Sequence, residues 1–308
     1  MGRWHADAIR HAGGTLVAGV DLDASRAVAL GAPASFRELG AALQATHVDV
    51  VHVCAPLGAH ENVAREALAS GAHVVIEKPV APDAERTRAI LDAAQAAGRL
   101  LVPVHQFLFQ RGVRRALAQR GLLGELVDVA YTAATAGADG SGLDPDELVD
   151  DVLPHPLALA ERLLGGTAGA AWAVARPARG ELRAATTLGS TSLTIAISAR
   201  GRPTRNELVL TGTRATVHAD LYHGFSVAER GPVSRARKVV RPLVLGGTTV
   251  AAASVNLARR AAGRQTAYPG LRELVAATYA SIRDGAPAPI SPAETLAVAQ
   301  ARDAVLGR

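Results

Sequence analysis

The chain has 308 residues, of which 49% are hydrophobic and 20% charged, which predicts two globular domains or one large one and excludes a long disordered tail. A net charge of +5 and a pI near 10.0 raise the question of nucleic-acid binding. The arginines are scattered and aromatic residues make up only 3%, so neither a basic stripe nor a stacking platform is predicted. The single Cys54 excludes an intramolecular disulfide and fits a reducing cytoplasm.

The first part of the chain alternates helices with short apolar strands. Residues 2–12 predict a helix with no strand before it, and their charges and histidines do not fit a signal peptide. We then expect strands at 15–21, 48–55, 72–76 and 100–104, and helices at 24–30, 36–45, 61–70 and 83–97. Strands separated by helices of this length predict βαβ units on a parallel sheet.

The first of these strands ends in Asp21, a feature of dinucleotide-binding folds. An acid at this place accepts hydrogen bonds from ribose hydroxyls and favours NAD over NADP. A strand can also end in Asp for turn reasons alone. The Gly-x-Gly and the central strand that normally precede the helix are missing, because the chain begins at what would be the third glycine, Gly2. We expect a start set too late or a truncation, with a naturally shortened protein as the alternative.

The second part of the chain predicts an α+β domain with a mostly antiparallel sheet. A strand at 125–134 and a Gly- and Asp-rich loop at 137–147 precede a helix at 155–164. Alternating short runs then predict strands at 170–176, 181–188, 192–199, 205–211, 215–220 and 224–230. Helices are expected at 270–284 and 292–306.

These elements predict a Rossmann-like domain at 1–122 and an α+β domain at 123–308, with helices 270–306 able to pack back on the first domain. The apolar segment 243–258 is too short and too polar to span a membrane. It fits a buried helix, a dimer contact or an interfacial segment, in that order of expectation.

The segment Val74-Val75-Ile76-Glu77-Lys78-Pro79 runs from a buried strand straight into a charged pair. In open α/β sheets ligands bind beyond the carboxyl ends of the strands, where Glu77 and Lys78 fall. The chain has only two lysines against thirty-one arginines, and an ammonium can change its proton state where a guanidinium cannot. The alternative is an ordinary Glu-Lys pair at a strand end.

Asp151 and His155 lie four residues apart at the start of a predicted helix. At that spacing they can meet on one face, where the carboxylate would orient a histidine that moves a proton near neutral pH. In the alternative, Asp150 and Asp151 cap the helix and His155 is a packed surface residue.

Together these motifs resemble the Gfo/Idh/MocA oxidoreductases, the glucose-fructose oxidoreductase and inositol dehydrogenase group. The resemblance rests on Gly2-Arg3-Trp4-His5-Ala6, Asp21, Cys54-Ala55-Pro56 with His60, Glu77-Lys78-Pro79, and Asp151 with His155. It implies hydride transfer between NAD or NADP and a hydroxyl or keto carbon of a sugar-, cyclitol- or secondary-metabolite-like substrate, by a cytoplasmic homodimer or homotetramer with no metal.

The resemblance also implies residue roles. The catalytic group would be Lys78, Asp151 and His155, and the bond between Lys78 and Pro79 is often cis in the family. The cofactor would contact Gly2, Arg3, Asp21, Cys54, Ala55, Pro56, His60, Glu77, Lys78 and Gln106.

Some positions depart from the family pattern. Ala158 stands where a second acid is frequent, and prolines flank His155. Two alternatives therefore stay open: a scaffold or regulatory protein that has lost nucleotide binding, and an isomerase or cyclase that uses the same residues without a cofactor. Nucleic-acid binding is not expected.

Overall fold

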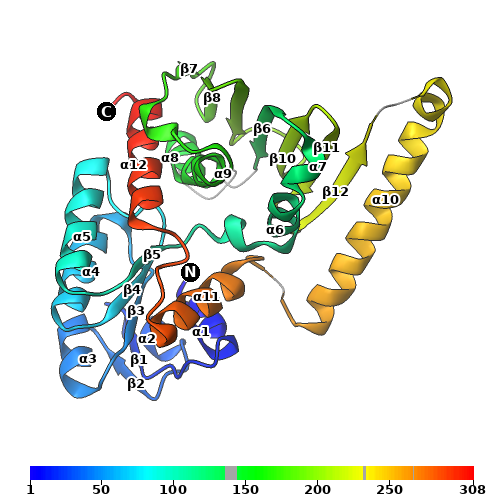
Figure 1. Ribbon diagram of the computed structural model, residues 1–308. Helices are drawn as coiled ribbons and strands as arrows, with labels where there is room; N and C mark the ends of the chain where they lie inside the picture. Colours follow the sequence, from blue (N-terminus) through cyan, green and yellow to red (C-terminus); the bar gives the residue numbers. More distant parts are fainter. Residues whose placement is uncertain (136–143, 232–233, 266) are drawn as a thin grey trace. The chain divides into compact units, whose positions relative to one another are not determined.

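The computed structural model describes residues 1–135, 144–231, 234–265 and 267–308, which divide into two compact units (Figure 1). The first unit consists of residues 1–105 and 271–303, and the second of residues 106–270 and 304–308. The boundary at 105 differs from the predicted one at 122. The reason is that helix α6 (Arg111–Ala118) packs on strands of the second unit.

The first unit contains two separate parallel sheets. Strands β1 (Ala18–Val20) and β2 (Ala34–Phe36) form one, and β3 (Val50–Val53), β4 (His73–Ile76) and β5 (Leu101–Pro103) form the other. Strands β1 and β3 are not paired, as expected for a Rossmann-like sheet without the strand that normally lies between them. Helix α3 (Leu39–Ala45) covers most of the helix predicted over 36–45, and the first residue of that range, Phe36, instead ends strand β2.

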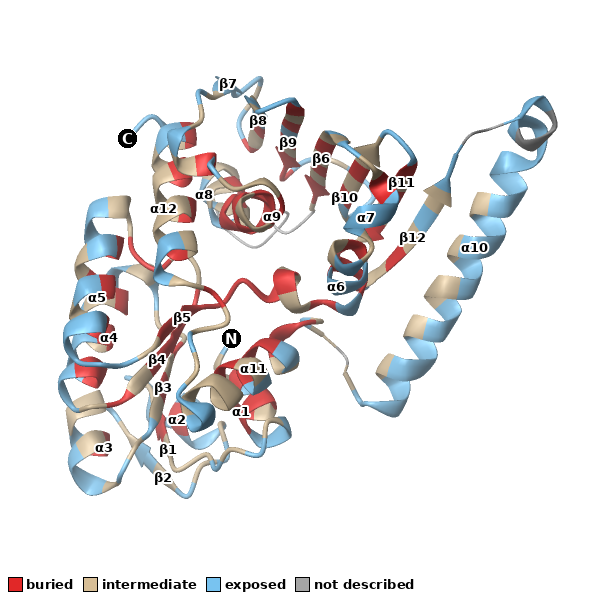
Figure 2. Ribbon diagram, in the orientation of Figure 1, coloured by how far each residue is buried: buried red, intermediate tan, exposed pale blue. Residues whose placement is uncertain are grey.

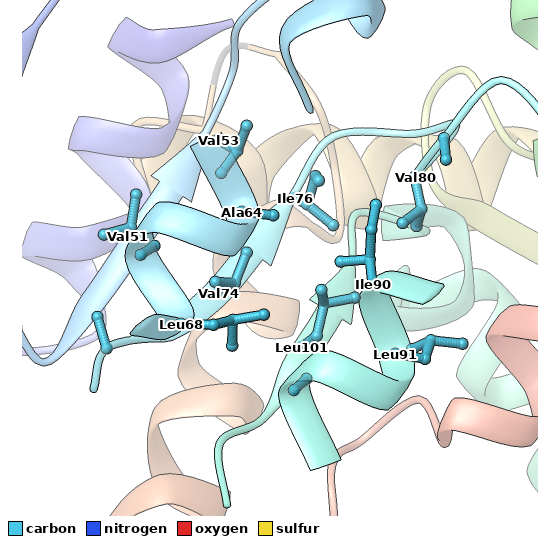
Figure 3. Close-up of a cluster of buried hydrophobic side chains, with 14 residues drawn as sticks. Val51, Val53, Ala64, Leu68, Val74, Ile76, Val80, Ile90, Leu91 and Leu101 are labelled. Atoms are coloured by element: carbon cyan, nitrogen blue, oxygen red, sulfur yellow. The ribbon is translucent and has the colours of Figure 1, made fainter. Parts of the chain in front are cut away.

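Helices surround these sheets. The first unit contains α1 (Gly2–His11), α2 (Ala24–Val28), α4 (His60–Ala69), α5 (Ala84–Ala96), α11 (Leu271–Asp284), most of α12 (Pro292–Leu306) and the short 3-10 turn η1 (Leu57–Ala59). Side chains from α4 and α5, such as Leu68 and Ile90, pack against Val74 and Ile76 of β4 in one buried cluster (Figure 3). This core fixes β4 and therefore the place where Glu77 leaves it.

The second unit is built on a seven-stranded sheet in the order β12-β11-β10-β6-β9-β8-β7. Its strands are β6 (Leu126–Ala134), β7 (Ala173–Ala175), β8 (Glu181–Leu188), β9 (Thr191–Ser198), β10 (Arg205–Gly212), β11 (Ala215–Asp220) and β12 (Phe225–Arg230). Only β6 and β9 are parallel among its neighbouring pairs, so the sheet is mostly antiparallel, as predicted. Its helical segments are α6, α7 (Arg120–Leu123), α8 (Pro145–Val152), α9 (Pro154–Leu164), α10 (Arg235–Ala262), η2 (Gln106–Phe109) and η3 (Thr167–Gly169). The predicted loop 137–147 lies largely outside the described residues.

Helix α10 contradicts the first expectation for the apolar segment 243–258. The segment is helical but largely exposed rather than buried, with Leu243 and Leu257 77% and 70% accessible (Figure 2). Within the described ranges, the structure contains no helix that is both long enough and apolar enough to cross a membrane.

Candidate active site

Two neighbouring strands of the first unit end side by side. Val53 of β3 is the register partner of Ile76 of β4, so the segments that follow, Cys54–Pro56 and Glu77–Pro79, leave the same edge of the sheet. The bond between Lys78 and Pro79 is cis, which confirms the prediction for this bond. In a parallel sheet this edge is the one at which ligands bind.

The carboxylate of Glu77 is hydrogen-bonded to His5 of helix α1. His5 is 1% exposed, and its Nε2 lies 2.9 Å from Oε1 of Glu77, which is itself 8% exposed. Burial opposes the charged form of His5, but the neighbouring Cys54 and Glu77 outweigh it and raise the pKa of His5 to about 9. Burial also opposes ionisation of Glu77, but His5 and Lys78 outweigh it and lower the pKa of this carboxyl. At neutral pH the two form a buried imidazolium–carboxylate pair.

The hydrogen bonds continue beyond His5. Its Nδ1 lies 2.8 Å from Nδ1 of His52, and Nε2 of His52 lies 2.9 Å from the hydroxyl of Tyr279 on α11. Burial and the nearby His5 cation lower the pKa of His52 well below its usual value, so its ring is neutral. A protonated His5 therefore donates to both His52 and Glu77, and His52 donates from Nε2 to the oxygen of Tyr279. Each ring nitrogen of His5 and His52 then has a hydrogen-bond partner.

His60 connects the two strand-end segments. Its ring is 2% exposed, with Nε2 2.9 Å from the carbonyl oxygen of Ala55 and Nδ1 3.0 Å from that of Pro79. Both ring nitrogens therefore face backbone carbonyls. His60 thus has a structural function, and its predicted cofactor contact remains a prediction.

Asp21 follows β1, and its carboxylate is partly committed to the local turn. Its Oδ1 accepts from the backbone N–H of Asp23, and Asp23 in turn caps α2 through Ser25. No hydrogen bond to Oδ2 of Asp21 is formed by the residues that the structure describes, so one carboxylate oxygen remains for a ribose hydroxyl. Helix α1, which carries Gly2 and Arg3, has no acidic residue in its first turn, and this suits a phosphate. The carboxylate acceptor of Asp21 and the uncharged-to-basic start of α1 are therefore compatible with the ribose and phosphate contacts predicted for them.

Asp151 and His155 belong to the second unit, whereas Lys78 belongs to the first. Asp151 lies near the end of α8 and His155 near the start of α9, and Leu153 between the two helices keeps α-helical dihedral angles (φ −53°, ψ −37°), so their meeting on one face stays a prediction. His155 is buried, and its ring stacks on Phe107 with centroids 4.3 Å apart. The structure thus does not support a surface position for His155.

The neighbouring polar residues of the second unit have separate functions. Asp150 pairs with Arg176 at 2.6 Å, while Asp144 is the acid that caps α8. Gln106 is 7% exposed, and its Oε1 has no hydrogen-bond partner among the described residues. A buried amide oxygen needs a hydrogen-bond donor, which a water molecule or a ligand can supply, and the predicted cofactor contact of Gln106 stays a prediction.

The roles of His5, His52 and Tyr279 were not predicted. His5 was only part of a family motif, and His52 and Tyr279 are 227 residues apart in sequence, so no local pattern joins them. One signal existed: His52 interrupts the otherwise apolar strand Val50–Val53, and a half-buried polar residue in a strand needs a partner.

Comparison with known proteins identifies chains similar to this one. Residues 1–105 match the profile of the Gfo/Idh/MocA family, described as an oxidoreductase family with an NAD-binding Rossmann fold. The chain is 31% identical over 121 residues to D-xylose 1-dehydrogenase (NADP(+)) 2 of Haloferax volcanii, a match that covers 38% of this chain and 37% of that protein. It is also 31% identical over 133 residues to dTDP-3,4-didehydro-2,6-dideoxy-α-D-glucose 3-reductase of Streptomyces violaceoruber, covering 41% and 39% of the two chains. These matches thus span well under half of each relative.

A solved structure extends the likeness to the whole fold. Levoglucosan dehydrogenase, determined in complex with NADH and levoglucosan, superposes with a TM-score of 0.78 at 13% identity, over 100% of this chain and 94% of that one. At this identity the likeness shows the fold alone. Both units of the present chain therefore have the architecture of that enzyme.

Proposed function

We propose that this chain, whose residues 1–105 belong to the Gfo/Idh/MocA oxidoreductase family, is an NAD(P)-dependent dehydrogenase or reductase that acts on a CH–OH or keto carbon of a sugar-like substrate. The observation that carries the proposal is the strand end at Glu77 and Lys78. There Lys78 follows Glu77, whose carboxylate is buried against protonated His5. His60 links this segment to the end of the neighbouring strand through the carbonyl oxygens of Pro79 and Ala55.

The chain's own residues supply positioning and proton transfer. Lys78 offers an ammonium to the reacting oxygen of the substrate, and its charge helps His5 to lower the pKa of the neighbouring Glu77 carboxyl. His155, with Asp151, moves the hydroxyl proton. A bound nicotinamide cofactor supplies the acceptor or donor of hydride.

Cofactor binding is assigned to residues of both units. Asp21 would accept from a ribose hydroxyl and favour NAD over NADP, while Gly2 and Arg3 lie at the helix start suited to the pyrophosphate. The strand-end loop Cys54-Ala55-Pro56 with His60, together with Glu77, Lys78 and Gln106, would line the remainder of the cofactor.

The substrate class follows from the relatives. Proteins similar to this chain are named for D-xylose, for a deoxyglucose nucleotide, for D-glucosides and for inositol. We therefore propose a polyhydroxylated ring as substrate, and a homodimer or homotetramer in a reducing cytoplasm as the working form. A panel of aldoses, glucosides, inositols and nucleotide sugars covers this range.

Substitution of Lys78 tests the proposal. Lys78→Ala should abolish nicotinamide-dependent turnover with a smaller effect on NADH affinity, because the ammonium acts on the substrate oxygen. The matched control is Lys238→Ala, which removes the only other lysine of the chain and should leave turnover unchanged. Equal loss of turnover and NADH affinity in Lys78→Ala would contradict this role.

Two alternatives predict different results with the same panel. A scaffold or regulatory protein would bind neither nucleotide and convert no substrate. An isomerase or cyclase would convert a substrate without added nicotinamide and give a product of unchanged oxidation state.

A further inference from the structure

Helix α10 has two chemically different sides. On the inner side, polar residues bond to the sheet of the second unit. Arg241 pairs with Glu229 of β12, with Nη2 2.8 Å from Oε2, and the side-chain amide of Asn256 donates to the carbonyl oxygen of His223 at 2.9 Å. Arg260 also donates to this carbonyl oxygen, at 3.2 Å. These contacts fix which side of α10 faces away from the sheet.

The outer side of α10 is apolar. Val239, Leu243, Val250 and Leu257 are 80%, 77%, 67% and 70% exposed. Their spacings of four, seven and seven residues place them on one stripe of the helix. From residue 242 to residue 258 the sequence has no charged residue. Figure 2 shows α10 exposed along most of its length. A continuous exposed apolar surface of this kind marks a docking surface.

The surroundings of this stripe are strongly basic. The sequence from Arg230 to Arg272 contains no aspartate or glutamate. A hollow of about 540 Å³ beside the start of α10 is lined by Arg214, Arg230, Lys238 and Arg241. Its one acid, Glu229, is already paired with Arg241. The occupant should therefore combine an apolar layer with negative charge.

An anionic phospholipid bilayer has this combination, and a second copy of the same helix does not. Two α10 helices packed through their stripes would bring basic ends together with no acidic residue in the segment to offset them. A helix with one apolar face and flanking basic residues lies in the plane of a membrane interface, and anionic lipids strengthen its binding.

We propose that α10 docks this protein on the surface of anionic phospholipid bilayers. The stripe of Val239, Leu243, Val250 and Leu257 would enter the boundary between headgroups and acyl chains, and the basic residues that flank the uncharged segment 242–258 would meet the lipid phosphates. This surface lies outside the proposed active site, so the inference does not depend on the proposed reaction.

Vesicle sedimentation with the full chain tests the inference. We expect binding to vesicles of phosphatidylcholine mixed with phosphatidylglycerol. The affinity for vesicles of phosphatidylcholine alone should be lower by about tenfold or more. Added salt should weaken the binding, since the lipid charge is screened. The double variant Leu243→Asp with Leu257→Asp should reduce the affinity about tenfold or more. Val28→Asp changes a 64% exposed valine of α2 and serves as the matched control that keeps full binding.

A second variant places a fluorescent reporter in the apolar stripe of the otherwise unchanged chain. Val250→Trp should shift its fluorescence to the blue only when anionic vesicles are added. Equal binding to neutral and anionic vesicles would overturn the inference. So would no binding to either, together with self-association that the Leu243→Asp, Leu257→Asp variant abolishes, because the stripe would then be an interface between copies of the chain.

Discussion

Substitution of Glu77 by Gln should reduce the pH dependence that His5, which contacts Cys54 and Glu77, gives to the stability of the first unit. The folded pKa of His5, about 9, lies above its ordinary value of 6.5. At about 1.4 kcal/mol for each pH unit, this rise contributes about 3 kcal/mol to the free energy of unfolding. Because the folded pKa is the higher one, that contribution is complete below pH 6.5 and is lost as the pH rises through 9.

The Glu77→Gln variant leaves a buried histidine without its carboxylate. At pH 6 we expect the variant to be about 3 kcal/mol less stable than the natural chain, the usual cost of removing one partner of a buried pair. By pH 9.5 the difference should be much smaller, since the natural chain has lost the His5 contribution by then. Cys54→Ala measures the share of the effect that comes from the thiol, the other neighbour that raises the pKa of His5.

Urea unfolding followed by tryptophan fluorescence is the assay. Trp4 lies in the first unit and Trp172 in the second, so a Trp172→Phe background reports on the first unit alone. The matched control is Asp49→Asn, which breaks the exposed pair of His47 and Asp49, whose side chains are 89% and 79% accessible, and should change stability by less than about 1 kcal/mol. If the natural chain and Glu77→Gln lose stability equally between pH 6 and pH 9.5, His5 is not held protonated by Glu77.

Further predictions concern the cofactor, the strand-end loops and the core. Asp21→Ser should weaken NADH binding about tenfold or more, through loss of a hydrogen bond to a charged acceptor, and improve NADPH binding; parallel fluorescence titrations check this, and an unchanged ratio of the two affinities would refute it. His60→Phe should destabilise the first unit by about 1–3 kcal/mol in urea unfolding, because the buried ring no longer hydrogen-bonds the backbone carbonyls of the two strand-end segments; no change would argue against His60 as the link between these segments. Ile90→Ala should cost about 2–5 kcal/mol by the same assay, since Ile90 is 0% exposed, whereas Val28→Ala on the surface should cost far less.

Much of the fold is predictable because buried strands in a parallel sheet are short apolar runs. Residues 72–76 and 100–104 predicted β4 and β5 to within one residue at most ends, and the six predicted strands from 170 to 230 all occur. Strand β2 could not be predicted, because Ala34-Ser35-Phe36 has only three residues and no buried member. Strand β2 forms because it pairs with β1, and the local sequence alone does not predict a strand there.

The environment of an apolar segment is harder to predict than its conformation. Helix α10 has the hydrophobicity of a buried helix, and only the polar contacts of Arg241 and Asn256 with the second unit decide that its apolar side faces outward. Likewise the Glu77-Lys78-Pro79 motif predicted the strand-end site. The hydrogen-bonded residues behind Glu77, which are His5, His52 and Tyr279, come from α1, β3 and α11 and depend on long-range packing that no spacing reveals.

Titration of the purified chain with NADH and NADPH, followed by nicotinamide fluorescence, tests the central claim most directly. We predict saturable binding of NADH that NAD competes away, with NADPH binding more weakly, and a weaker NADH signal in Asp21→Ser than in an Asp23→Asn control. A folded chain that binds neither nucleotide would contradict the claim that this protein is a nicotinamide-dependent dehydrogenase.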